Sequence, residues 1–244
     1  MPEQVRHDEE EEASLHLTPD DWEVIRLSLK VAIVGVAVML PIAFALAYVL
    51  ARGRFPGRIL LDAIVHLPLV LPPVVTGWAL LILFGRAGPI GGWLDRAFGF
   101  TVMFRWTGAA LAAAVMALPL MVRAMRLSIE AVDRRLEGAA RSLGASPWRA
   151  FRTVTLPLSL PGVWAGLVLG FARSIGEFGA TISFVSNIPG QTRTLPIAIY
   201  TALQLPDGES TVVRLASVSV VLSLGALIGS EWLVRRQSGR AHVL

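Results

Sequence analysis

The sequence has no cysteine and few charged residues, and both absences narrow what the protein can be. Without cysteine it can form neither a disulfide framework nor a thiolate metal site. Charged residues make up 16% of the 244 residues and hydrophobic residues 54%, whereas about a quarter of a soluble domain is charged. The composition therefore predicts an integral membrane protein.

The residues needed for ATP hydrolysis or for a hydrolase site are also missing. Lys30 is the only lysine, and its neighbours do not form the Gly-Lys-Ser/Thr sequence of a phosphate-binding loop. Of the four histidines, only His66 lies in an apolar run, and no paired nucleophile and base accompany it. We therefore expect no catalytic residue, metal site or cofactor on this chain. Energy must come from another protein or from an ion gradient.

The net charge of +4 does not indicate nucleic-acid binding, because the arginines gather at the ends of apolar runs. Residues 1–23 carry nine acidic residues and are expected to form a solvated N-terminal tail. They lack the apolar core of a cleavable signal peptide. Residues 24–236 are then the transmembrane domain, and residues 237–244 are a C-terminal tail.

Five apolar runs predict about five transmembrane helices, because each approaches the length that crosses the ~30 Å hydrocarbon core. They cover residues 31–50, 63–85, 106–122, 158–185 and 215–230. Pro68, Pro72 and Pro73 predict a break or bend in the second run. Shorter helices are expected within residues 91–98 and 197–205.

Arginine placement predicts the orientation of these spans. The connector 51–58, the stretch 123–152 and the residues that follow the last apolar run (231–244) hold 13 arginines, against 5 in the N-terminal tail and residues 86–106 and 186–211. An odd number of spans places the termini on opposite sides. Because basic residues are in excess on the cytoplasmic side, we expect a cytoplasmic C-terminus and an N-terminus outside. Arg26, Lys30 and Arg214 lie at the outer ends of spans and are exceptions to this rule.

The stretch from Glu130 to Pro161 is the longest strongly charged one after the N-terminal tail. Its apolar residues share one helical face over two turns; they are Leu136, Ala139, Ala140 and Leu143. Gly144 is the residue type that ends a helix in a left-handed turn. Ser146 and Pro147 are typical of a new helix start, and Pro157 and Pro161 are expected to end that second helix. From periodicity alone, this helix-turn-helix is equally compatible with an ordinary cytoplasmic loop.

The residues of this segment resemble the coupling loop of the importer class of ABC-transporter permeases. The matching positions are Ala139, Ala140, Gly144, Leu156 and Pro157. The resemblance implies that residues 130–157 dock into a cleft on an ATPase subunit. Gly138 stands where the family's motif has a glutamate, and Glu137 lies one residue earlier.

Arg173 and Glu177 lie within the fourth apolar run, where charged side chains are costly and usually face protein or water. Four residues apart on a helix, they share one face and can pair. One interpretation is an internal ion pair. The other is that Arg173 supplies positive potential along a path for anions, which Pro72 and Pro73 help to shape, because irregular backbone at membrane depth is tolerated where it lines a cavity.

Residues 171–196 and 66–78 resemble the molybdate-transport permease family, and the resemblance extends from Trp22 to Trp232. It implies a type I ABC importer permease that forms a homodimer in the inner membrane. Two ATP-binding subunits would carry ATP and Mg²⁺, and a periplasmic binding protein would deliver the oxyanion.

Two alternatives remain at the level of sequence. Sulfate and tungstate are tetrahedral dianions like molybdate, so a sulfate or tungstate permease of the same family fits the same residues. A gradient-driven secondary transporter is a different class, for which inverted repeats and intramembrane acidic residues are typical. No internal repeat is visible, and Glu177 is a single acidic residue beside an arginine, which disfavours that class.

Overall fold

The computed structural model describes residues 16–241, and all regular secondary structure in this range is helical. The helices are α2 (Pro19–Arg52), α3 (Arg58–Val70), α4 (Pro73–Phe84), α5 (Pro89–Phe98), α6 (Trp106–Ala131), α7 (Arg134–Ser142), α8 (Pro147–Ala150), a π-helical turn (Phe151–Thr155), α9 (Leu156–Ile175), α10 (Gly179–Val185), α11 (Leu195–Ala202) and α12 (Glu209–Ala241). The expectation of an all-α protein is confirmed.

Four stretches of the described chain are long and apolar enough to span a membrane: α2, α6, residues Pro147–Ile175 and the Glu209–Ala226 part of α12. α3 and α4 together form a fifth candidate, bent by 117°. At the bend, Leu71 and Pro72 have extended ψ angles of 143° and 134°, because a residue before proline is driven out of the helical region. About five spans and a broken second run are therefore confirmed.

α2 begins earlier than the sequence analysis placed it. Thr18 and Asp21 form a reciprocal cap, in which each side chain accepts a hydrogen bond from the other's backbone N–H at 3.2 and 2.9 Å. The Asp21 carboxylate also pairs with Arg214 of α12 at 3.1 Å, and both side chains are nearly buried. Residues 19–23 thus belong to the bundle, and the tail boundary at residue 23 is corrected. Residues 1–15 lie outside the described residues.

The remaining expected elements shift by a few residues. The short helix expected within 91–98 is α5, and the one expected within 197–205 is α11. α12 continues to Ala241, so residues 237–241 extend the last helix and do not form a separate tail. Residues 242–244 lie outside the described residues.

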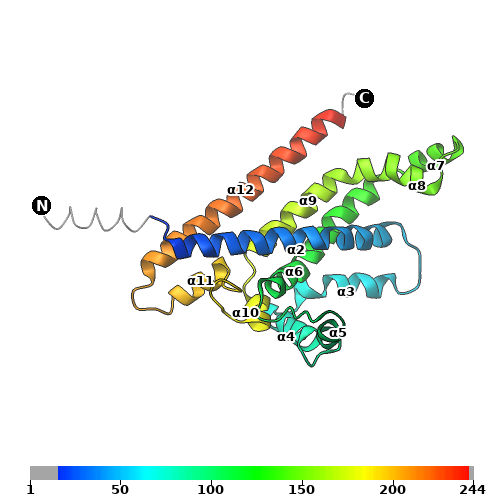
Figure 1. Cartoon of the computed structure of the whole chain (residues 1–244). Helices are drawn as coiled ribbons and strands as arrows, with labels where there is room; N and C mark the ends of the chain where they lie inside the picture. The colour runs from blue at the N-terminus through cyan, green and yellow to red at the C-terminus, as the bar shows by residue number, and fades with distance from the viewer. Residues whose placement is uncertain (1–15, 242–244) are drawn as a thin grey trace, which may run out of the picture.

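α2, α6 and α9 form the packed centre of the bundle (Figure 1). Three glycines spaced by four residues on α9, namely Gly162, Gly166 and Gly170, face α6. A Cβ atom on them would lie 2.2 Å from Ser128 Cβ, 2.9 Å from Met125 Cε and 2.8 Å from Met121 Cγ. Small residues let two membrane helices approach at backbone distance. The sequence analysis did not single out this stripe.

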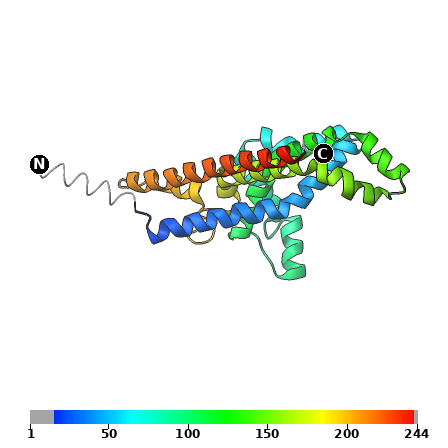
Figure 2. The same cartoon turned by 90° about the horizontal axis from the view of Figure 1, so that it is seen from above.

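The described chain begins at one end of α2, and α12 finishes towards the other end (Figures 1 and 2). The connector 53–57 and the α7–α8 segment also lie at that second end, on the right of Figure 1. The arginine-rich segments that the sequence analysis grouped therefore do lie together.

Candidate functional site

The α7–α8 segment is built by local capping. Asp133 caps α7 by accepting a hydrogen bond from the Arg135 N–H at 2.8 Å. Ser146 caps α8 in the same way from the Arg149 N–H at 3.3 Å, and Pro147 occupies the first helical position. The helix-turn-helix predicted from the sequence is confirmed.

Gly144 makes the turn between these two helices. Its φ is +90°, a left-handed conformation that a residue with a Cβ atom adopts only at a cost. The Gly144 N–H donates to the Arg141 carbonyl and the Ala145 N–H donates to the Ala140 carbonyl, both at 3.0 Å. These two bonds form a Schellman motif, which satisfies the last carbonyls of α7. A Cβ atom at Gly144 would meet nothing within 4 Å, so the backbone angle, not space, requires glycine.

The prediction that Pro157 and Pro161 end the second helix is wrong. The chain continues from α8 through the π-helical turn into α9, where Pro157 lies in the first turn and Pro161 lies inside the helix. A proline ring clashes with the carbonyl of the preceding turn. The wider π-helical turn immediately before Pro157 makes room for that ring, so the helix continues through Pro157 and does not end.

The predicted apolar face of this segment is uncovered. No residue of α7 is buried, and the side chains of Leu143 and Trp148 are 89% and 65% exposed. Leu136 is also exposed, and Ala139 and Ala140 lie beside it on the same short helix. An exposed apolar patch of this kind marks a surface that contacts another molecule.

Glu137 ties this segment to the rest of the bundle. Its Oε1 atom accepts hydrogen bonds from the Arg52 guanidinium at 3.0 Å and from the Thr155 hydroxyl at 2.7 Å. The Arg52 guanidinium also donates to the Val132 carbonyl at 3.0 Å. Thr155 is fully buried, and the Arg52 side chain is only 12% exposed. One carboxylate therefore connects α7 to the end of α2 and to the π-helical turn. Neighbouring Gly138 faces open space.

A second connection to α2 is aromatic. The Phe151 ring packs edge-on against Phe44 and Tyr48 of α2 and stacks on Trp148. These four rings and Leu156 line an apolar cavity of about 630 Å³. The exposed tip of the segment around Leu143, called the knob below, thus projects from a part of the chain that is attached to α2 in two ways. One is the set of hydrogen bonds of Glu137, and the other is the set of aromatic contacts of Phe151.

Arg173 and Glu177 form the ion pair that the sequence allowed. The Glu177 side chain is 1% exposed and that of Arg173 is 26% exposed. Glu177 also accepts a hydrogen bond from the Ala180 N–H at 2.8 Å. The carboxylate therefore satisfies the first turn of α10, directly after the chain has left α9 at Gly176. The Arg173 side chain remains partly accessible.

The structure brings two helix breaks together: the one between α3 and α4 at Pro72, and the one between α9 and α10 at residues 176–178. Pro73 lies against Gly179, where an added Cβ would be 2.8 Å from the Pro73 Cβ. One turn further along α4, a Cβ on Gly77 would lie 2.5 Å from the Ala180 carbonyl oxygen. The break at Pro72 and Pro73 is therefore packed against the break that Glu177 caps, although the two are about a hundred residues apart in sequence. Pro72 and Pro73 themselves remain exposed.

A family model described as "Binding-protein-dependent transport system inner membrane component" matches residues 38–239. The chain belongs to this family. The molybdenum transport system permease protein ModB of Escherichia coli strain K12 is 56% identical over 225 residues, which cover 92% of this chain and 98% of that protein. The sulfate transport system permease protein CysW of the same strain is 35% identical over 226 residues, covering 92% of this chain and 77% of that protein.

Solved structures show that this permease has the type I ABC importer fold. A bacterial ABC transporter that imports the acidic polysaccharide alginate matches with a TM-score of 0.72 at 17% identity, covering 92% of this chain and 82% of that one. The MetNI methionine ABC transporter matches with a TM-score of 0.65 at 18% identity, covering 89% and 94%. The fold expected from the sequence is confirmed.

The sequence analysis missed Arg52 and Thr155 as the hydrogen-bond partners that attach the α7–α8 segment to the bundle. Arg52 was counted only as a topology signal, and Thr155 was not singled out. No local pattern could have found them, because Arg52 lies 85 residues before its partner Glu137. The position of Glu137 one residue before the motif's usual glutamate was the available hint.

We predict that Gly144→Val impairs the coupling segment while Gly138→Val does not. Both glycines face open space, but only Gly144 has a positive φ, so valine there is disfavoured by roughly 1–2 kcal/mol and redirects the knob. The measurement is co-purification with the ATPase subunit that the family resemblance implies. Equal retention of the ATPase by both variants would show that this turn does not position the knob.

We further predict that Glu137→Ala loosens the α7–α8 segment from the bundle. Backbone amides of α7 should exchange with deuterium faster, because Arg52 and Thr155 lose their shared acceptor. Arg52→Ala should act in the same direction, and the double variant should add little beyond either single one, since the residues share one interaction. Arg141→Ala, in an exposed position of the same helix, is the control. Additive effects would show that the pair does not act as a unit.

Proposed function

We propose that this permease translocates molybdate across the inner membrane as the non-catalytic membrane subunit of an ATP-driven importer. The proposal that molybdate is the substrate is supported by the 56% identity to a molybdenum permease over nearly the whole of both chains. A sulfate permease is a more distant relative at 35% identity. ATP and Mg²⁺ would be bound by a separate ATPase chain, and no cofactor is needed on this one.

The coupling segment supports the proposed contact with the ATPase. Its apolar knob around Leu143 is exposed, while its base is held to α2 by Glu137 and Phe151. A knob that docks into an ATPase cleft needs this combination, because a loosely attached patch would bind without transmitting movement. On this proposal α7–α8, the connector 53–57 and the C-terminus are cytoplasmic, and the N-terminus is outside.

The exposed helix break supports a homodimer. Backbone irregularity at membrane depth is tolerated only where protein covers it or it borders water. Pro72 and Pro73 are exposed in the single chain. A second copy facing this region would cover the break, and the two copies would enclose a path between them. A periplasmic oxyanion-binding protein would deliver the substrate to this path, and ATP-driven closure of the ATPases would rock the two bundles.

Uptake by the assembled complex tests the proposed function. The permease, with the ATPase and binding protein from the same genome, is reconstituted in proteoliposomes that contain ATP. We expect molybdate uptake that depends on ATP and on the binding protein. Sulfate and tungstate are supplied in parallel as competitors. Uptake of sulfate with no uptake of molybdate would assign the chain to the sulfate branch, and uptake driven by an ion gradient without ATP would refute the importer assignment.

The role of Arg173 is tested in the same assay. If the positive charge of this partly exposed side chain attracts the dianion, Arg173→Gln should lower the uptake rate while the complex stays assembled. If Arg173 serves only to neutralise buried Glu177, the double change Arg173→Gln/Glu177→Gln should restore uptake, because glutamine can still accept the Ala180 hydrogen bond without a charge. Full restoration would remove Arg173 from the path.

A further inference from the structure

Two neighbouring cavities lie at the start of α6, on a part of the chain that the coupling segment and the helix breaks do not use. The first has a volume of about 740 Å³ and lies between the end of α4, the start of α5 and residues 101–105. The second, of about 600 Å³, lies between α2, the start of α6 and residues 190–191. Phe104 and Arg105 line both cavities, so the two cavities adjoin and make up one region of the surface.

The polar side chains of this region are mainly hydrogen-bond donors. Arg86 and Arg105 line the first cavity, and Lys30, Arg105 and Gln191 line the second. No carboxylate lines either cavity within residues 16–241, although Glu23 lies beside Gly190 at the edge of the second. Guanidinium and ammonium groups donate hydrogen bonds and accept none. The excess of donors and positive charge fits an anion.

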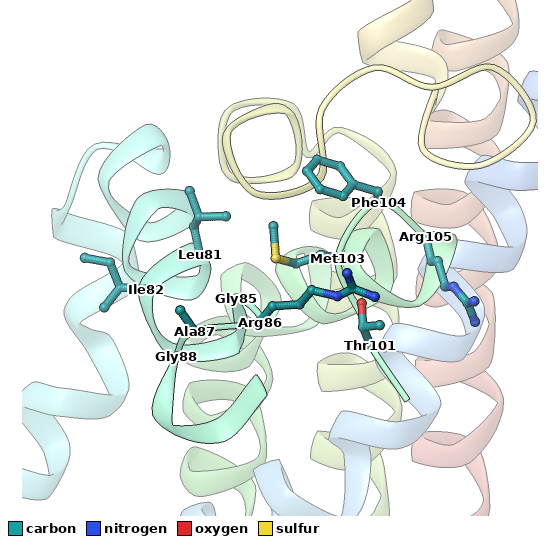
Figure 3. A pocket seen from close by; sticks show the side chains of 10 residues that line it. All are labelled: Leu81, Ile82, Gly85, Arg86, Ala87, Gly88, Thr101, Met103, Phe104 and Arg105. Atoms are coloured by element: carbon teal, nitrogen blue, oxygen red, sulfur yellow. The ribbon is translucent and has the colours of Figure 1, made fainter. Parts of the chain in front are cut away.

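The three cationic groups are exposed and are not neutralised by a carboxylate of the described chain, and Lys30 is also held in place by an aromatic ring. Figure 3 shows the Arg86 side chain crossing the first cavity towards Thr101, while the Arg105 side chain turns away from the other labelled side chains. Arg105 also lines the second cavity. Within the described part of the chain, neither arginine side chain has an ion-pair or hydrogen-bond partner. The Lys30 ammonium lies 3.8 Å from the centre of the Trp106 ring, an interaction that fixes its position without removing its charge.

The backbone between the cavities is strained. Phe104 has a φ of +57°, which is rare for a bulky side chain and often marks a functional position. Arg105 follows it as the N-cap residue of α6, and no side chain caps this helix. The uncapped first turn adds partial positive charge beside Arg105 and Trp106, which reinforces the cationic side chains.

The position of the region relative to the coupling segment gives it a role. α6 begins beside the cavities and ends just before α7. Its 26 residues correspond to a length of about 39 Å, enough to cross the hydrocarbon core. The cavities therefore lie about one helix length from the α7–α8 segment, and in the proposed orientation this is the outer side, where substrate would arrive.

We infer that the two cavities form an entry site that binds a tetrahedral oxyanion dianion after its release at the outer face. The identity of the cargo rests on the proposed function, whereas the anion-binding chemistry rests on Lys30, Arg86, Arg105 and Gln191. The cavities are larger than a bare oxyanion, so the ion enters with part of its hydration shell. Arg105, which borders both cavities, passes the ion between them.

Equilibrium binding of sodium tungstate to the permease–ATPase complex in nanodiscs tests this inference without transport. The wild-type complex should bind tungstate at low ionic strength, less tightly as salt is raised, and sulfate should compete. Lys30→Gln/Arg105→Gln should weaken binding about tenfold or more, because each lost charged donor contributes a charge-assisted hydrogen bond. Arg96→Gln is the matched control, since the Arg96 side chain donates a hydrogen bond to the Gly92 carbonyl and lines neither cavity.

Transport gives a second readout of the same variants. At a saturating level of binding protein, the single change Arg105→Gln should raise the molybdate concentration for half-maximal uptake and leave the maximal rate nearly unchanged. This single variant also decides the question if the double variant does not assemble. Unaltered tungstate binding in the variants, together with weaker attachment of the binding protein, would overturn the entry site in favour of a docking surface.

The two proposals fail in different ways. A complex that imports no oxyanion, but whose tungstate binding depends on Arg105, refutes the proposed function and keeps the anion site. A complex that imports molybdate, but binds tungstate equally with and without Lys30 and Arg105, refutes the entry site alone. Absence of tungstate binding by the wild-type complex at millimolar concentrations also refutes it.

Discussion

The contact between α6 and α9 determines how force can travel through this bundle. Gly162, Gly166 and Gly170 bring the α9 backbone close to Met121, Met125 and Ser128 of α6. In lipid, where apolar side chains gain little from avoiding the surroundings, such close packing is a main source of helix association. The segment from Val132 to Thr155 connects these same two helices. A push on its exposed knob therefore reaches both helices at once.

The hydrogen bonds of Glu137 extend this connection to α2. Arg52 ends α2, Thr155 ends the π-helical turn, and both donate to the same carboxylate oxygen. Phe151 adds an aromatic contact with α2. α2, α6 and α9 are thus joined both along their length and at the end that carries α7 and α8. Movement as a rigid body, as in other domain-rocking transitions, follows from this arrangement more readily than bending of single helices.

The helix breaks show how irregular backbone is made tolerable within the bundle. Glu177 satisfies the first turn of α10 and is itself neutralised by Arg173. Gly77 and Gly179 allow α4 and α10 to meet at backbone distance. A side chain at either glycine would separate the two broken segments. Cationic groups lie at two places in the molecule: Arg105 precedes the first residue of α6, where Lys30 of α2 lies over Trp106, and Arg173 lies beside the breaks. In the proposed function both places would border the path of the anion.

Local signals in the sequence determined the class of protein, most helices and the turn at Gly144. Hydrophobic run length specified the spans, prolines specified the α3–α4 break, and Gly144 specified a left-handed turn, because each effect acts within a few residues. Two predictions were wrong: that the N-terminal tail extends to residue 23, and that the second helix ends at Pro157. α2 begins earlier because Arg214 pairs with Asp21, and the helix continues because a π-helical turn accommodates Pro157. Only the tertiary structure showed that Arg52 donates a hydrogen bond to Glu137, that Pro73 packs against Gly179, and that Lys30 and Arg105 line the same cavity. Contacts between residues far apart in the chain depend on how helices pack, and a periodic pattern within one helix carries no information about its partner.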